Sequence, residues 1–414
     1  MASRPRLAYV YHPRSFATMS LVEAARERCD VIWVIDTSVA DSGTMARLLR
    51  RFGVVVDVAG LDLDEAAALV GEHSPTALLA LADDCLVLAA ELARRLGLSF
   101  ASPELARLFT DKRLQREALA RGGLPTPAQW LLSGPAAGFA FLEGEDAFPA
   151  VLKPRRGEAS RDTLPVASYQ QLVTLWESEG FARDGRAFVL EQYIADGMPD
   201  VAGESFAGYV SVETVVRDGD ITHLAVNGRM PPAFPFRETG FFIPSALDDA
   251  TAAQVLDTAT RAAQALGVRS GCLHTEIKLS PTGPVVIEVN GRIGGGVPEL
   301  LQLAAGVDLL GIAFDLALGR LTQLAVPTTN CVAYLFYVQS PPELHHVDEV
   351  TGLDDLRQVP GVREVTLNRG PGSDVSWRFG NHGHVFSVLG TAGDHDELRR
   401  LAARIPRLVE IRGS

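Results

Sequence analysis

The chain has 414 residues, enough for roughly two to four domains of about 150 residues each. Hydrophobic residues make up 47% and charged residues 21%, which is typical of a globular protein, and the formal net charge of −13 argues against a protein that binds nucleic acid or an anionic membrane. Four scattered cysteines without a C-x-x-C pair indicate neither a disulfide framework nor a zinc site, so a cytoplasmic location is expected.

The first 110 residues alternate between short apolar runs and helix-like stretches. The runs predict strands at 6–11, 31–35, 54–58 and 77–81. Parallel strands need such crossovers, so residues 1–105 are predicted to form an N-terminal, doubly wound, Rossmann-like α/β domain. A dinucleotide site is not expected, because no G-x-G-x-x-G motif follows the first strand.

The whole pattern predicts an α/β and α+β, multidomain protein. A helix is expected over 103–121, and Asp218-Gly219-Asp220 predicts a tight hairpin between two strands. Further strands are expected at 150–153, 188–194, 209–217, 221–226, 273–279 and 285–290, with helices at 169–178, 250–266 and 397–404. Residues 321–414 are predicted to form a small C-terminal α+β domain.

The sharpest functional feature is a pair of glutamates on two strands joined by a turn at Ser280-Pro-Thr-Gly283. If Ser280 lies opposite Pro284 across a three-residue loop, the pairing continues along both strands. In that register Glu276 lies directly opposite Glu288. Facing carboxylates repel each other, so this arrangement favours a cation between them.

The same register places His274 opposite Asn290, whose amide oxygen would complete an oxygen-only set of ligands. Such a set suits Mg²⁺ or Mn²⁺ that shares its other positions with phosphates and water. The alternative is a slipped register that sends one glutamate to solvent, or a pairing of Glu276 with Lys278 on one face. The run from Arg292 to Gly296 argues against this alternative, because its glycines let backbone amides approach an anion.

Lysine is rare in the chain: only Lys112, Lys153 and Lys278 occur among 38 basic residues. A retained lysine can mark a place that needs a compact ammonium group, although biased codon usage would have the same effect. Lys153 ends a predicted strand and precedes a small, polar, basic loop at 154–163 that could fold over phosphates. Neither this lysine nor Lys112 belongs to a G-x-x-x-x-G-K motif, so a P-loop is excluded.

From about residue 109 to 316 the sequence resembles the ATP-grasp superfamily. The resemblance rests on Asp111-Lys112, on Lys153 with its loop, on Leu190-Glu-Gln-Tyr-Ile194 and on Glu276…Glu288-Val-Asn-Gly-Arg292, which follow the order of that family. The stretches 209–213, 236–245 and 274–278 look most like the L-amino acid ligases that make dipeptides. The resemblance implies an ATP-grasp domain at 106–320 with a mobile lid at roughly 125–195.

The resemblance also implies a set of site residues. Those implied to bind ATP are Lys112, Lys153, Ser160, Arg161, Glu191, Gln192, Tyr193 and Ile194. Those implied to hold Mg²⁺, with Mn²⁺ as an alternative, are Glu276, Glu288 and Asn290. The implied catalytic residues are Lys153, Glu276, Glu288 and Arg292, and the implied substrate-binding residues are Arg237, Glu238, His274, Arg292, Gly294 and Gly295.

Several of these assignments have alternatives. Arg237 and Glu238 would recognise the carboxylate and the amine of an amino acid, or form a surface ion pair. His274 would orient a substrate or be a hydrogen-bonded structural histidine. The acid that binds the ribose is left open among Asp196, Asp200 and Glu204.

The function expected from the resemblance is that of an ATP-dependent ligase. The enzyme would activate a carboxylate as an acyl phosphate and join it to an amine, with amino acids or similar molecules as the expected substrates. An acceptor of another kind, bicarbonate or a phosphoribosyl compound, is the first alternative, and an inactive nucleotide-binding protein is the second. The expected partners are small-molecule carboxylates and amines, without nucleic acid or membrane, and a homodimer is expected by family analogy.

Overall fold

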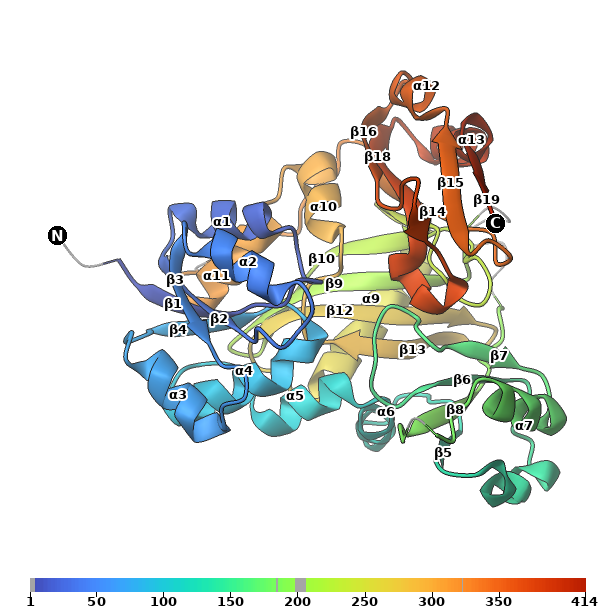
Figure 1. The fold of residues 1–414 in the computed structure, drawn as a ribbon, viewed down its shortest axis with the longest axis horizontal. Coiled ribbons are helices and arrows are strands. Elements are labelled where there is room, and N and C mark those ends of the chain that lie inside the picture. Colours follow the sequence, from blue (N-terminus) through green and yellow to red (C-terminus); the bar gives the residue numbers. More distant parts are fainter. Residues whose placement is uncertain (1–3, 184, 198–205, 322) are drawn as a thin grey trace.

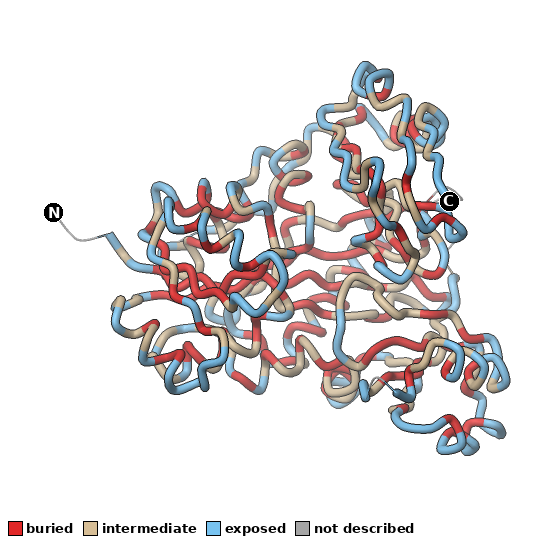
Figure 2. The backbone as a smooth tube through the Cα atoms, viewed as in Figure 1, coloured by how far each residue is buried: buried red, intermediate tan, exposed pale blue. Residues whose placement is uncertain are grey.

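A computed structural model describes residues 4–183, 185–197, 206–321 and 323–414 of the chain. Its strands form four sheets, and Figure 1 shows them from the blue N-terminal region on the left to the red C-terminal region at the upper right. The largest sheet crosses the middle of the molecule. Buried residues concentrate along the strands (Figure 2).

The N-terminal sheet is parallel and has the strand order β3-β2-β1-β4. Its strands are β1 (Arg6–Val10), β2 (Asp30–Ile35), β3 (Gly53–Asp57) and β4 (Ala77–Ala80), with helices α1 (Thr18–Arg26), α2 (Ser42–Leu49), α3 (Leu63–Gly71) and α4 (Asp83–Leu96). Successive residues of β1 face opposite sides, so Leu7 and Tyr9 pack toward α1 and α2, while Ala8 and Val10 pack toward α3 and α4. The predicted doubly wound α/β unit is confirmed.

The single helix predicted over 103–121 is wrong, because the structure divides it into α5 (Pro103–Thr110) and α6 (Lys112–Arg121). Asp111 between them has an extended backbone, with φ −123° and ψ 102°, and its carboxylate accepts a hydrogen bond from the amide of Leu114. A short acidic side chain competes for backbone amides in this way and favours a helix start. Lys112 therefore begins a helix of its own.

A second sheet is antiparallel and has the order β5-β8-β6-β7. Its strands are β5 (Gln129–Leu132), β6 (Ala150–Pro154), β7 (Leu164–Val166) and β8 (Phe188–Gln192), and it is accompanied by η1 (Ala136–Gly144) and α7 (Tyr169–Ser178). Trp176 is fully buried at its centre, in edge contact with Phe139, Phe181 and Phe188. β8 ends at Gln192, two residues before the predicted end of that strand.

The largest sheet is antiparallel and has the order β13-β12-β9-β10-β11-β14-β18-β16. Its strands are β9 (Tyr209–Arg217), β10 (Asp220–Arg229), β11 (Gly240–Ile243), β12 (Gly271–Ser280), β13 (Gly283–Asn290), β14 (Val332–Gln339), β16 (Val362–Leu367) and β18 (His384–Ala392). Arg217 pairs with Asp220, which confirms the predicted hairpin. Because β11 pairs with β14, the sheet continues across residue 320, and the domain boundaries stay predictions.

The remaining elements cover this sheet and extend it at the C-terminal end. They are α9 (Asp249–Ala265), α10 (Val297–Ala305), α11 (Leu309–Ala317), α12 (Leu353–Arg357), η2 (Trp377–Gly383), α13 (His395–Leu408), and a three-stranded sheet of β15 (His346–Thr351), β17 (Ser373–Asp374) and β19 (Glu410–Gly413). Within the described ranges no single helix has the length and apolar character to cross a membrane; α10 and α11 meet that test only as a pair bent by 112°.

Candidate active site

The hairpin of β12 and β13 brings Glu276 directly opposite Glu288, as the sequence predicts, but by a different route. Ser280 pairs with Gly283, so the turn has two central residues instead of three. That register alone would place Ile287 opposite Glu276. A bulge leaves Ile287 without a partner on β12 and shifts the pairing by one residue, so that Glu288 faces Glu276.

The bulge decides which side of the sheet carries the charges. Side chains alternate between the two faces of a strand, so a shift of one residue moves a whole row to the other face. One face of this sheet packs against α9 through Val212, Ile277 and Leu279. The opposite face, which we call the polar face, is formed by Ser211, Glu213, Asn227, Arg229, His274, Glu276, Lys278, Glu288 and Asn290.

All three lysines form ion pairs with acids around the polar face. Nζ of Lys112 lies 2.9 Å from Glu288 and donates a hydrogen bond of 2.7 Å to the carbonyl of Gly157. Burial lowers the pKa of Lys112, but the charge and hydrogen bond of Glu288 outweigh this effect and raise it. Lys112 therefore remains an ammonium ion that connects β13 with loop 155–163.

The other two lysines pair with acids on β8 and on the segment that follows it. Lys153 is buried, with Nζ 2.5 Å from Glu191 on β8. Burial raises the pKa of Glu191, but the charges of Arg116 and Lys153 lower it to about 2, so the carboxylate is ionised. Lys278 lies 2.5 Å from Asp196, and Asp200 and Glu204 lie outside the described residues.

Glu191 to Ile194, which the resemblance implies to bind ATP, lie at the end of β8 and directly after it. The amides of Gln192 and Tyr193 donate hydrogen bonds to the carbonyls of Ala128 and Pro149, so these two amides are already used within the protein. The hydroxyl of Tyr193 donates to Asp196. The role of this segment, including Ile194, stays a prediction.

Loop 155–163, which contains Ser160 and Arg161, lies against η2 from the C-terminal region. The amide of Asn381 donates a hydrogen bond of 2.8 Å to the carbonyl of Ala159. Ala159, Ser160 and Asp162 all have positive φ, between 52° and 56°, which non-glycine residues seldom adopt. The loop is thus held by contacts from outside it as well as by its own sequence.

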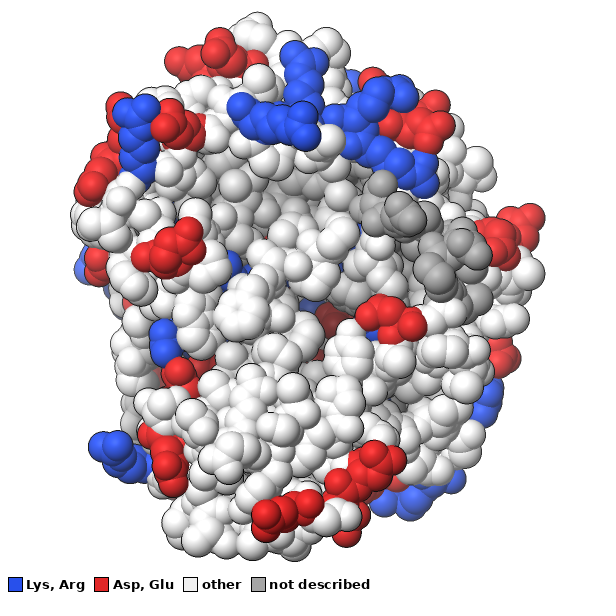
Figure 3. Space-filling view, turned by 90° about the vertical axis from the view of Figure 1, so that its right-hand side faces the viewer, with Lys and Arg blue, Asp and Glu red and all other residues white. Residues whose placement is uncertain are grey.

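A cavity of about 200 Å³ lies where the polar face meets the carboxyl ends of β1 and β4. In α/β sheets ligands bind at such ends. Its lining includes His12, Arg14, Glu158, Arg229, Glu238, His274, Glu276, Arg292, Gly295, Tyr337, Asn381 and His382. In the view of Figure 3 a few charged atoms show deep between uncharged ones, while most charged side chains lie at the rim.

Arg292 lies in this cavity and binds Asp83 at the start of α4, with Nη2 2.7 Å from the carboxylate. Burial lowers the pKa of Arg292, but Asp83 raises it above its ordinary value, so the guanidinium keeps its charge. Sequence reasoning missed Asp83 as a site residue. Its place at the start of the helix that follows β4, at the carboxyl edge of a parallel sheet, is the signal that would have found it.

The structure does not bring Arg237 to the cavity. Its guanidinium is buried and donates to the carbonyls of Phe234 and Ser340, so it serves the local fold. Arg229 on β10 takes the expected place beside Glu238, with which it forms a short ion pair. Arg229 and Arg237 lie close together in the sequence and have the same chemistry. The signal that favoured Arg229 was its position two residues after Asn227 on a strand, which places both side chains on the same face.

His274 is held between two acids on the polar face. Its Nδ1 lies 2.5 Å from Glu213, a buried residue that sequence reasoning did not assign, and its Nε2 lies 3.6 Å from Glu276. Burial lowers the pKa of His274, but the charge and hydrogen bond of Glu213 raise it to about 9. Glu213 also accepts a hydrogen bond from the amide of Gly294, which ties the glycine run to β9.

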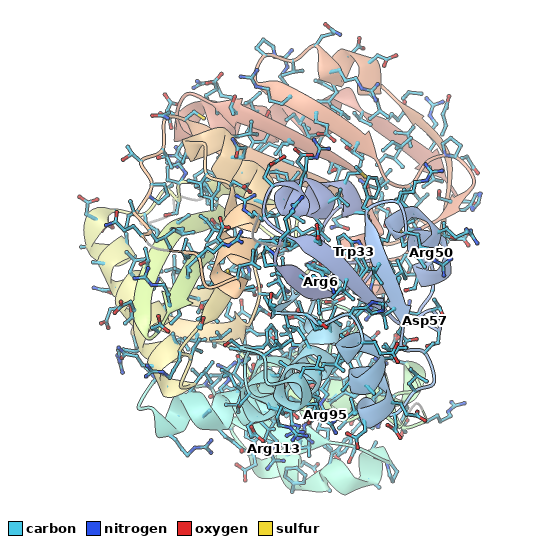
Figure 4. All side chains as sticks on the ribbon, turned by 90° about the vertical axis from the view of Figure 1, so that its left-hand side faces the viewer. Arg6, Trp33, Arg50, Asp57, Arg95 and Arg113 are labelled. Atoms are coloured by element: carbon cyan, nitrogen blue, oxygen red, sulfur yellow. The ribbon has the colours of Figure 1, made fainter. Side chains whose placement is uncertain are left out.

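A larger cavity of about 690 Å³ lies elsewhere, along the N-terminal sheet. Arg6, Trp33 and Arg50 are among its lining residues and are labelled in Figure 4. Among the residues that the structure describes, its lining contains none of the site residues predicted from sequence. The smaller cavity therefore carries the candidate site.

Comparison with known proteins agrees with this geometry. A family model for the ATP-grasp domain matches residues 146–299, so the chain contains an ATP-grasp domain. Carnosine synthase 1 of Gallus gallus is 31% identical over 265 residues, which are 59% of this chain and 27% of that protein. Alanine–anticapsin ligase of Bacillus subtilis is 26% identical over 270 residues, 59% of this chain and 56% of that protein.

The solved structure of an L-amino acid ligase from Bacillus licheniformis has the same fold. It aligns over the full length of both chains with a TM-score of 0.78 and 19% sequence identity. The matched regions cover little more than half of alanine–anticapsin ligase and about a quarter of carnosine synthase. The predicted ATP-grasp fold is confirmed.

Proposed function

Because the chain contains an ATP-grasp domain, we propose that it is an ATP-dependent carboxylate–amine ligase that joins two amino acids or amino-acid-like molecules. One observation carries the proposal: Glu276, which lines a cavity with both cationic and anionic side chains, faces Glu288, and Glu288 is paired with Lys112. The relatives named for amino-acid ligation support the substrate class.

We assign the triphosphate of ATP to the space between the polar face and loop 155–163. Lys112 already bridges these two parts, and Lys153 enters from β6 beside Glu191. Phosphoryl transfer depends mainly on positioning and on charge neutralisation, and ammonium groups at the phosphates supply both. Ser160 and Arg161 would contact the phosphates from the loop, and Glu191 to Ile194 would border the adenine.

The residues of the hairpin fit Mg²⁺. Within the described part of the chain no cluster of three His, Cys, Asp or Glu side chains forms a complete metal site. Glu276, Glu288 and Asn290 instead offer two carboxylates and an amide, which suits a cation that takes its other ligands from phosphates and water. When bound, Mg²⁺ would neutralise charge on the phosphate oxygens.

The proposed reaction has two steps. A carboxylate oxygen of the first substrate attacks the γ-phosphorus of ATP, and the bond to ADP breaks, which forms an acyl phosphate. The amine of the second substrate then attacks the acyl carbon, phosphate leaves, and the amine loses a proton. Arg292 borders the cavity as a permanent cation and would stabilise the negative charge on the acyl phosphate and on the tetrahedral intermediate.

The cavity carries charges of both signs for an amino acid. Arg229 and Glu238 line it as a short ion pair, and His274 and Gly295 lie close to them. A guanidinium suits the carboxylate of an amino acid and an acid suits its ammonium group. We therefore replace Arg237 by Arg229 in the proposed substrate site and keep Glu238, His274, Gly294 and Gly295.

A screen of amino-acid pairs tests the function. The purified protein with ATP and Mg²⁺ should release phosphate only when a suitable acid and amine are both present, and mass spectrometry should detect the condensed product. Phosphate release that depends on bicarbonate or on a phosphoribosyl amine instead would contradict amino-acid ligation. Light scattering of the same preparation tests whether the protein is the homodimer expected by family analogy.

A further inference from the structure

α6 covers the outer edge of β13, and the residues that do so lie on one turn of that helix. β13 ends the order of strands in the largest sheet, so one side of its backbone has no strand partner among the residues that the structure describes. Gln115 pairs with Val289 as a strand would: its amide donates to the carbonyl of Val289 at 2.8 Å, and its oxygen accepts from the amide at 2.8 Å. Exposed strand edges are commonly covered in this way.

Arg116 binds the bulge itself. Its Nη1 donates to the carbonyl of Val286 at 2.6 Å and its Nη2 donates to the carbonyl of Ile287 at 3.0 Å. The side chain is buried, with 4% of its surface exposed, so these hydrogen bonds form away from water. They hold the two carbonyls at the point where the register of the hairpin shifts.

The same guanidinium neutralises the acid that holds Lys153. Nε and Nη2 of Arg116 lie 2.9 Å and 2.8 Å from one oxygen of Glu191, while Lys153 lies 2.5 Å from the other. One side chain therefore links the bulge before Glu288 to the lysine of β6. Its flat fork makes contacts that an ammonium point charge could not reproduce together.

We propose that Arg116 is a positioning residue, which holds the β13 bulge so that Glu288 faces Glu276 and which aligns Lys153 through Glu191. The proposal rests on the proposed function for the meaning of these two groups. Without the bulge, the register of the turn would put Glu288 opposite Thr275, on the face that packs against α9. Arg116 itself would touch neither substrate.

The test compares Arg116→Lys and Arg116→Met with the wild-type protein. Residues that orient metal ligands typically change metal affinity or activity by about 10- to 100-fold when they are replaced. ATP binding is measured by calorimetry at a series of Mg²⁺ concentrations and in EDTA. The Mg²⁺ concentration that gives half of the maximal effect on ATP binding should rise by about this factor in both variants. Amide hydrogen exchange at 286–290 should become faster in the absence of nucleotide.

Arg113→Lys is the matched control. Arg113 lies on the same helix, pairs with Glu117 at 2.9 Å, and is labelled near the lower edge of Figure 4. Its replacement should leave the Mg²⁺ dependence and the exchange of 286–290 as in the wild type.

The proposal would be overturned if both Arg116 variants kept the Mg²⁺ dependence of the wild type, or if amide exchange at 286–290 did not change. It would also be overturned if Arg116→Lys alone kept both properties, because a positive charge would then suffice. If Arg116→Met does not fold, Arg116→Lys decides. A wild-type protein that binds ATP with Mg²⁺ but releases no phosphate with amino acids would remove the ligase function and leave this comparison intact.

Discussion

The β12–β13 hairpin and loop 155–163 supply opposite sides of the proposed nucleotide site, and they are held in different ways. The hairpin belongs to a ladder, with β9 on one side and α6 side chains on the other. Residues 155–163 pair with no described strand. They are held by side-chain contacts, among them Lys112 on Gly157, Arg14 on Glu158 and Arg186 on Asp162, and by the amide of Asn381 on Ala159.

This difference indicates which part is rigid and which can move. Displacement of the backbone at Glu276 or Glu288 requires the loss of strand pairing, whereas the loop can move when partly exposed ion pairs and single hydrogen bonds break. A fixed set of acids facing an adjustable set of phosphate contacts is suited to an enzyme that must admit ATP and release ADP. The following predictions test this division, beginning with the largest expected effect.

Glu288→Gln should remove one of the two carboxylates with which the β12–β13 hairpin is proposed to hold the cation. Several kcal/mol of charge stabilisation depend on the proposed cation, so phosphate release should fall by at least about 10³-fold. The variant should still fold, because Gln keeps the size of the side chain and the ladder is unaltered, but its melting temperature should fall because Lys112 loses its charged partner. Activity close to that of the wild type would exclude Glu288 from the proposed metal site.

Lys112→Met should separate the two sides, since this lysine contacts both Glu288 and Gly157. A hydrogen bond to a charged group typically contributes about 1.5–3 kcal/mol, so the loss of one phosphate contact should lower kcat/KM for ATP by about 10- to 100-fold. Lys112→Arg tests whether the site needs a compact ammonium group. Full activity in that variant would favour codon usage as the reason why lysine is rare.

Gly380→Ala should disturb the loop from the C-terminal side. Gly380 has φ +60°, and an added Cβ would overlap the carbonyl oxygen of Ala159. Overpacking of this kind typically costs about 1–3 kcal/mol, so the KM for ATP should rise several-fold. Gly372→Ala is the control, because Gly372 also has a positive φ, +87°, but has open space around it. Equal KM values in the two variants would show that η2 does not support the loop.

Glu158→Gln should give the smallest effect, on stability as a function of pH. Burial, together with the charges of Asp83 and Asp84, raises the pKa of Glu158 above its ordinary value. A raised carboxyl pKa gives a contribution to stability that is complete below the unfolded value and is lost as pH rises through the folded value. The melting temperature of the variant minus that of the wild type, both measured without nucleotide, should therefore be more positive at pH 7 than at pH 4.

The exposed Glu145 supplies the control for that measurement. Glu145→Gln should follow the wild type across the same pH range. A Glu158→Gln curve that runs parallel to the wild-type curve would mean that ionisation of Glu158 does not destabilise the protein.

Much of the fold and part of the site could be predicted from local sequence patterns. Alternating apolar and polar residues indicated β12 and β13, and Pro281 and Gly283 marked the turn between them. The number of residues in that turn was wrong, and the bulge at Ile287 was missed, because it depends on hydrogen bonds from Arg116, 171 residues away. The two errors cancelled, so the predicted pairing of Glu276 with Glu288 was correct.

By itself, the sequence determined that acids and lysines gather on the strands and loops of an α/β protein, because strand periodicity and residue chemistry are local properties. Only the tertiary structure decided which arginine serves which purpose. Arg229, Arg237 and Arg292 have the same chemistry, but one faces the cavity beside Glu238, one is used by backbone carbonyls, and one is held by Asp83. The partner of a long, charged side chain is set by which segments the fold places around it, and this cannot be read from its neighbours in the chain.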